Sequence, residues 1–211
     1  MPTALTSLLP LVNVKAKMVP EPLALFVLRD AAAEFCRQTG IVTEILPDIT
    51  LVAGTAEYPL VSATPDYYRG VKALDVWLDG AEITPRTASQ LKDSFGNWTP
   101  HTGVPRHYTQ LTEGTLRLYP VPEAAGTLVV RAATAPALTA THIDDALADR
   151  WWKAIVAGAL SALFDMEDEP FYKPDASAKQ LGIFNAYVDE AKHAASVGYT
   201  RARLRTTAHR Y

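Results

Sequence analysis

Side chains that could carry out chemistry are few in this sequence of 211 residues. Three consecutive carboxylates, Glu167, Asp168 and Glu169, could supply the acid and base of a hydrolase. Consecutive acids beside a helix end are more typical of a solvated loop. We therefore interpret these residues as a loop and assign no catalytic residue.

Motifs for phosphate, metal and nucleophile chemistry are absent from the sequence. The 11 glycines are scattered, without a G-x-G-x-x-G or G-x-x-x-x-G-K-[ST] run. There is no H-E-x-x-H, paired C-x-x-C or Gly-x-Ser-x-Gly. The five histidines lack ligand spacing and are interpreted as structural or surface residues: His101, His107, His142, His193 and His209. We predict no cofactor, no metal site and no enzymatic activity.

Composition and charge exclude several further classes. The one cysteine, Cys36, cannot form an internal disulfide, and its apolar neighbours predict a buried thiol. A net charge of −3 does not suggest general nucleic-acid binding. No apolar run is long enough to cross a membrane, and no secretory signal begins the chain.

Basic residues gather at the C-terminus. After Glu190 there is no acidic residue, while Lys192 and four arginines follow. Residues 199–211 therefore form a basic arm without apolar periodicity. Because arginine and tyrosine are well suited to anchoring, we predict that this arm docks on another protein subunit. A solvated, unattached terminus is the alternative.

Three long helices must position whatever the chain binds. The first runs from about Glu21 to Gln38 and ends at Gly40. The second, from about Asp144 to Met166, is apolar around most of its circumference and must be covered on several sides. After the Pro170 loop the third is capped by Asp175 or Ser177 and ends near Gly198. Its apolar seam is expected at Leu181, Phe184, Val188, Ala191 and Ala195.

Short strands separate the first helix from the other two. The Asp79-Gly80 turn predicts a hairpin between Val71–Leu78 and Ala81–Thr84. A second hairpin is expected between His107–Leu111 and Thr115–Tyr119, and the last strand covers Thr127–Ala133. The spacing favours an antiparallel sheet or small sandwich.

The expected architecture is α+β. Residues 1–41 and 136–198 should form a discontinuous helical bundle, an N-terminal helix plus a C-terminal helix hairpin. Residues 42–135 should form an inserted antiparallel β domain, followed by the basic arm. Aromatic side chains in exposed loops or on an over-apolar helix are candidates for a subunit or tail interface. They are Tyr67, Tyr68, Trp98 and Trp151.

Several stretches resemble bacteriophage head-to-tail adaptor proteins of the tail tubular or tail accessory type, the ring proteins beneath the portal of short-tailed phages. The first helix of that family is similar to Pro20–Leu25 followed by Leu28–Cys36, and one of its hairpins to Ile49–Leu60. Further similar stretches are Val76–Gly80, Gly103–Tyr108, Leu116–Pro122 and Trp152–Gly198.

The resemblance implies a virion protein at the head–tail junction, assembled in the host cytoplasm. It implies a homo-oligomeric ring, a dodecamer of twelve copies, bound to the portal protein above and a tail nozzle or tube protein below. During DNA ejection the lumen would make only weak, non-specific contact with the genome, and no membrane is involved. The arm would reach the portal through Arg201, Arg203, Arg205 and Tyr211.

Two other functions remain open from the sequence. A tail-associated peptidoglycan hydrolase would need a carboxylic acid facing a second carboxylate across a cleft. A nucleic-acid-binding module would use the basic arm, with an affinity that falls steeply with salt.

Overall fold

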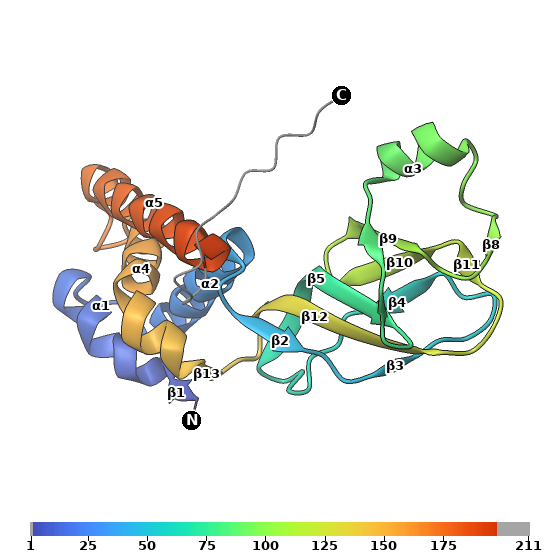
Figure 1. Cartoon of the computed structure of the whole chain (residues 1–211). Coiled ribbons are helices and arrows are strands. Elements are labelled where there is room, and N and C mark those ends of the chain that lie inside the picture. Colours follow the sequence, from blue (N-terminus) through green and yellow to red (C-terminus); the bar gives the residue numbers. More distant parts are fainter. Residues whose placement is uncertain (1, 198–211) are drawn as a thin grey trace.

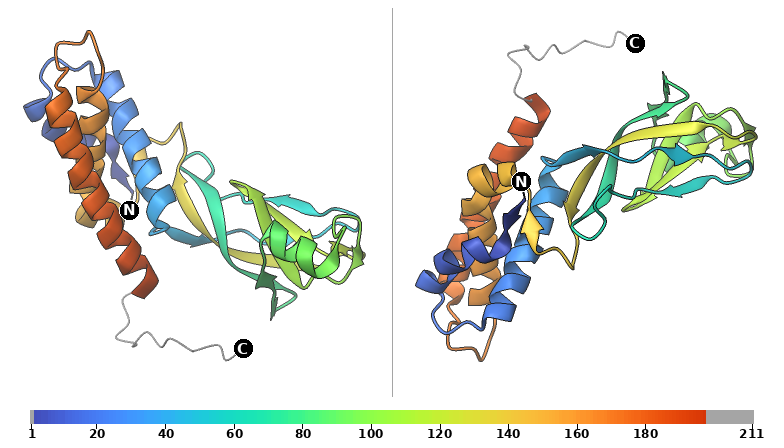
Figure 2. Two further views of the ribbon diagram at one scale, coloured as in Figure 1. Left: turned by 90° about the horizontal axis from the view of Figure 1, so that it is seen from above. Right: turned by 90° about the horizontal axis from the view of Figure 1, so that it is seen from below.

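The computed structural model describes residues 2–197. These residues form a helical half and, beside it, a half made mostly of strands (Figure 1). Figure 2 shows the two halves extending in different directions from a junction at α2, β5 and β12. Within the described range the helices are the 3₁₀ helix η1 (Leu5–Leu8), α1 (Leu9–Lys15), α2 (Glu21–Thr39), α3 (Ala88–Phe95), α4 (Asp145–Phe164) and α5 (Pro174–Val197). The strands are β1 (Thr3–Ala4), β2 (Thr43–Ile45), β3 (Ile49–Thr50), β4 (Glu57–Pro59), β5 (Tyr68–Leu78), β6 (Ala81–Glu82), β7 (Thr84–Pro85), β8 (Thr102–Gly103), β9 (His107–Thr112), β10 (Thr115–Tyr119), β11 (Val121–Pro122), β12 (Thr127–Pro136) and β13 (His142–Ile143).

The three long helices lie where the sequence predicts them. α2 has Pro22 in its first turn and ends at Gly40, whose φ of 61° is left-handed. α4 begins at Asp144, whose carboxylate accepts a hydrogen bond of 2.8 Å from the Ala146 N–H. None of the helices in the described part of the chain has the length and hydropathy needed to cross a membrane.

Aromatic rings hold α2, α4 and α5 together. The Phe35 ring lies 5.5 Å from the Trp151 ring and 6.1 Å from the Phe184 ring, centroid to centroid. Gly158 permits this close packing, because a Cβ placed there would lie 2.9 Å from the Phe184 ring and 3.0 Å from the Ala31 methyl. The prediction that the second long helix is covered on several sides is confirmed.

The predicted seam of α5 is confirmed at Phe184, Val188 and Ala191, which are buried, and is wrong at its two ends, Leu181 and Ala195, which are exposed. Ser177 and Gln180 are buried, whereas Leu181 is 48% exposed. The Ser177 hydroxyl donates to the Ser161 carbonyl oxygen at 2.9 Å, and the two hydroxyl groups lie 3.2 Å apart. The prediction of Leu181 in the seam is wrong, because a mutually bonded serine pair occupies the buried position. Ser177 is therefore an interior residue of α5, not a cap.

The strands form two larger sheets and two short pairs. One sheet has the order β2-β12-β5-β6 with β3 also paired to β12, and the other has the order β4-β10-β9-β7. Both predicted hairpins are confirmed, β5 with β6 and β9 with β10. The first turns at Asp79 and Gly80, with φ values of 48° and 84°.

The α+β class is confirmed, but the predicted helical bundle with an inserted antiparallel β domain is wrong. The strands form several sheets, one curled into a half-barrel. Two pairings, β7 with β9 and β8 with β11, are parallel. Val71 of β5 and Ala135 of β12 belong to the same buried cluster as α2, α4 and α5. The helical core thus continues into the strands, because α2 packs on β12, in which every residue from Ala132 to Pro136 is buried.

The predicted domain boundaries at residues 41/42 and 135/136 are not tested by this arrangement and stay a prediction.

The N-terminal segment forms η1 and α1, which were not among the predicted helices. Pro10 lies in the first turn of α1, where its missing N–H costs no hydrogen bond. β1 then pairs with β13 beside the start of α4, with Thr3 opposite Ile143.

Candidate interaction surfaces

The four aromatic residues predicted to form an interface differ in accessibility. Tyr67 is exposed, and its ring packs edge-on against His142 at 5.8 Å. Tyr68 is half-buried, and its hydroxyl oxygen accepts a hydrogen bond from the Asp144 backbone N–H. Burial, above all, raises the pKa of the Tyr68 phenol above its ordinary value. Trp151 is only 2% exposed, in the core between α2 and α5.

Trp98 is also enclosed within the chain. With Leu91 and Tyr119 it forms a small core beneath α3. The Arg117 guanidinium lies 5.1 Å from the centroid of the Trp98 ring and 2.8 Å from a Glu57 carboxylate oxygen. Trp98 and Arg117 therefore attach α3 and its loop to the strands. The interface role of the four aromatic residues stays a prediction, and Tyr67 is the one most open to a partner.

Two histidines complete this aromatic cluster. The His107 ring is stacked on the Tyr119 ring, 6.4 Å between centroids, and His101 Nδ1 lies 3.1 Å from the Tyr119 hydroxyl. Burial lowers the pKa of His107, and the nearby Arg86 charge lowers it further. Within residues 2–197 no group of three or more His, Cys, Asp or Glu side chains is placed to hold a metal ion. His101 and His107 act here as packing residues.

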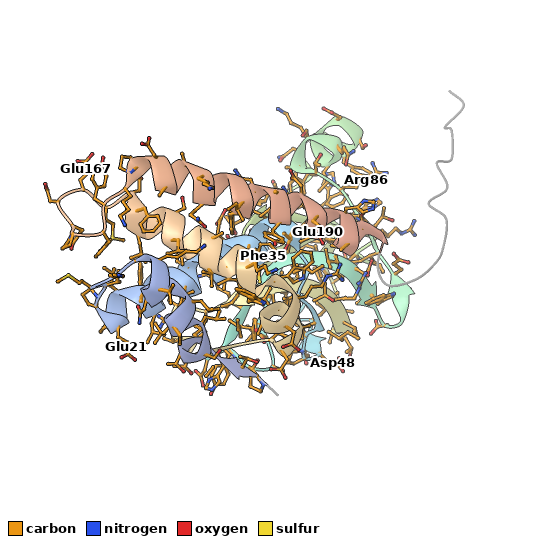
Figure 3. All side chains as sticks on the ribbon, turned by 90° about the vertical axis from the view of Figure 1, so that its left-hand side faces the viewer. Glu21, Phe35, Asp48, Arg86, Glu167 and Glu190 are labelled. Atoms are coloured by element: carbon orange, nitrogen blue, oxygen red, sulfur yellow. The ribbon has the colours of Figure 1, made fainter. Side chains whose placement is uncertain are left out.

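The three consecutive acids lie on the loop between α4 and α5. Glu167, at the far end of the helical half in Figure 3, and its neighbours Asp168 and Glu169 are all exposed. They line none of the described cavities of about 200 to 600 Å³. A glycoside-hydrolysing pair needs two carboxyl groups that face each other across a cleft. This loop does not have that arrangement.

The predicted docking arm, with Arg201, Arg203, Arg205 and Tyr211, lies outside the described residues, so its role stays a prediction.

Apolar side chains that sequence reasoning did not single out are exposed on the helical half. Val14 in α1 is 76% exposed, Met18 in the following loop 83%, and Phe26 in α2 52%. Leu23, Val27, Ala31 and Phe35 form the apolar stripe of this helix, and Phe26 lies outside it. The position of Phe26 in the helical pattern could therefore have indicated that its side chain is exposed. Large apolar side chains that are exposed in a single copy are candidates for contact with other molecules.

Comparison with known proteins supports a protein-binding role. No curated protein matches the chain. The family model described as SU10 adaptor protein matches residues 13–208, which is nearly the whole chain. The resemblance seen in the sequence is thereby confirmed: the chain belongs to the SU10 adaptor protein family and is a bacteriophage adaptor protein.

Proposed function

We propose that copies of this chain form a closed ring in the virion that joins the portal to the tail and lets the genome pass. The observation that carries the proposal is the exposure of three apolar side chains of the helical half, Val14, Met18 and Phe26, on a chain of an adaptor family. A single copy leaves these side chains in water, whereas neighbours in a ring would cover them. Twelve copies is the number that the family resemblance implies.

The second part of the proposal concerns the partners. Residues 199–211 carry four arginines and no acid, and they anchor each copy to the portal. The opposite end of the ring receives the tail protein. Contacts with the passing genome are weak and independent of its sequence.

Mixing the protein with purified portal rings tests the proposal. Native mass spectrometry should show several copies on each portal ring, and deletion of residues 199–211 should abolish binding while far-UV circular dichroism stays unchanged. Undiminished binding after the deletion would rule out the arm as the anchor. A full-length protein that stays monomeric in the presence of portal would contradict the ring.

A zymogram on peptidoglycan addresses the hydrolase alternative directly. We expect no clearing. Clearing that is abolished by Glu169→Gln would replace the structural role by an enzymatic one.

A further inference from the structure

A groove of about 270 Å³ opens between α1, α4 and α5. Its lining is mainly apolar and includes Trp152 and Val156 of α4 and Ile183 and Tyr187 of α5. Two exposed lysines also line it, Lys15 of α1 and Lys153 of α4. Val14, whose side chain is exposed, directly precedes Lys15 in α1.

Neither lysine is neutralised within the described part of the chain. Among residues 2–197 the ion pairs include neither Lys15 nor Lys153. The Lys153 ammonium instead lies 5.5 Å from the centroid of the Trp152 ring. An occupant that covered this groove would desolvate both ammonium groups. It must therefore bring carboxylates as well as apolar surface, because a buried charge without a partner is strongly unfavourable.

The α4–α5 loop has the complementary chemistry. Glu167, Asp168 and Glu169 are exposed without an ion-pair partner in the described range, and the exposed Pro170 and Tyr172 stand beside them. Like charges at consecutive positions repel one another, so cations from another surface would stabilise this loop.

The backbone of the loop is held in place, so the Cα positions of its three acids are defined. Buried Phe171 anchors the loop to the core. The Tyr172 N–H donates to the Glu169 carbonyl oxygen at 3.0 Å, and the Lys173 N–H donates to the Phe164 carbonyl oxygen at 2.9 Å. A fixed loop loses little conformational entropy when it binds.

We propose that the α4–α5 loop of one copy seats in the lysine-lined groove of a second copy, with carboxylates of residues 167–169 paired with Lys15 and Lys153. This contact rests on the proposed ring and identifies its subunit interface. A copy cannot fill its own groove, because Val156 in the groove and Phe164, where α4 ends before the loop, are separated by about 12 Å along the helix. The chain's own basic arm would bring like charge to the lysines.

The geometry of the contact suits a ring. Groove and loop are different patches of one chain, so the contact is head-to-tail, and each copy uses both patches. A head-to-tail contact closes into a ring when its rotation permits, whereas a contact between two identical patches stops at a dimer.

Charge reversal in two separate variants tests the proposal. The groove variant carries Lys15→Glu and Lys153→Glu, and the loop variant carries Glu167→Lys and Glu169→Lys. Each alone opposes like charges at every contact, so self-association on portal rings should fall by about tenfold or more. In a 1:1 mixture each acidic groove meets a basic loop and each basic groove meets an acidic loop. The mixture should therefore assemble like the wild type, with the two variants alternating.

A control variant with Lys72→Glu and Lys92→Glu makes the same change of net charge in the strand half and should assemble normally. Far-UV circular dichroism establishes that each variant is folded. In the wild-type assembly, a carbodiimide should cross-link Lys15 or Lys153 to residues 167–169 between isotopically labelled and unlabelled copies.

Three results would overturn the contact. The single variants could assemble normally, or the mixture could fail to restore assembly. Alternatively, the groove variant could lose portal binding while copies still associate with one another, which would assign the groove to a portal segment. In each of these cases the wild-type ring still forms and the proposed function stands. A wild-type protein that forms no ring with portal would instead contradict the proposed function itself.

Discussion

α4 and α5 are adjacent helices of similar length, but their surroundings differ. Twelve of the 20 residues of α4 are buried, and they lie on nearly all sides of the helix. α5 buries one narrow face, which consists of Ser177, Gln180, Phe184, Val188 and Ala191. Leu181 and Ile183, on the two sides of this buried face, are exposed to solvent. Apart from Trp152 and Lys153 at the groove, α4 is therefore mostly enclosed by its own chain, whereas the surface of α5 outside its buried face, its outer face, is available to a neighbour.

This difference separates folding from assembly. Substitutions at buried positions around α4 should lower the free energy of unfolding of a single copy. Substitutions on the outer face of α5 should leave that free energy unchanged and act, if anywhere, on association. Because association raises apparent stability, unfolding should be compared at one low protein concentration.

The largest effect is expected from Trp151→Ala. The Trp151 ring contacts the rings of both Phe35 and Tyr187, so its removal leaves a cavity at the centre of the helical core. We expect a loss of about 3–5 kcal/mol in the free energy of unfolding, measured by urea denaturation followed by circular dichroism. Trp152→Ala is the matched control. Because Trp152 is only half-buried, its substitution should lower the free energy of unfolding by clearly less. Equal losses would show that α4 is not enclosed as described.

The next largest effect is expected from Cys36, which lies in the same core and should make the free energy of unfolding depend on pH. Burial, with a smaller contribution from Asp144, raises the pKa of this thiol from 9.0 to about 12. The folded chain therefore keeps a proton that the unfolded chain releases, so this stabilisation is complete below pH 9 and is lost as the pH rises toward 12.

The measurement is the free energy of unfolding between pH 8 and 11, for the wild type and Cys36→Ala. Above pH 9 the wild type should lose stability more steeply than the variant, by up to about 1.4 kcal/mol per pH unit. Tyrosines and lysines titrate in both proteins, so the difference in slope isolates the thiol. Parallel curves would mean that Cys36 is accessible to water.

The long helices could be predicted from the sequence, but their exact packing could not. Helices α2, α4 and α5 were predictable, because apolar periodicity agreed with strong stop signals such as Gly40 and Pro170. The burial of Ser177 in α5 was not predictable, since Ser177 becomes an interior residue only by bonding Ser161, 16 positions away. A hydrophobic pattern assigns such a position to Leu181 instead.

The sheets show the same limit. Hairpins with local turns were predictable, whereas the parallel pairs and the two-sided burial of β12 depend on segments far apart in the chain. The interface residues named from the sequence stay a prediction. Aromatic type alone pointed to Trp98 and Trp151, but both rings are enclosed within the chain. The groove was not predicted because one of its walls, α1, is a short helix with Pro10 in its first turn and was not among the three predicted helices.

A smaller effect is expected where the two helices meet. Ser161→Ala removes a hydroxyl that lies 3.2 Å from both the hydroxyl and the carbonyl oxygen of Ser177. The loss should be about 0.5–1.5 kcal/mol. Combined with Ser177→Ala, it should be non-additive by about 0.5 kcal/mol or more, because the two hydroxyls form one network. Ser196→Ala removes an exposed hydroxyl of α5 and serves as a control with little effect. Full additivity would show that the serine pair does not couple α4 to α5.

The smallest effect on folding is expected from Leu181→Gln on the outer face of α5. Glutamine has nearly the same helix propensity as leucine, and the side chain that it replaces is 48% exposed. The free energy of unfolding at low concentration should therefore change by less than about 0.5 kcal/mol. Val188→Gln on the buried face of the same helix is the matched substitution and should be strongly destabilising, because it buries an amide without a partner. If Leu181→Gln destabilised a single copy as much as Val188→Gln, the outer face of α5 would belong to the core of its own chain and would not be free for a neighbour.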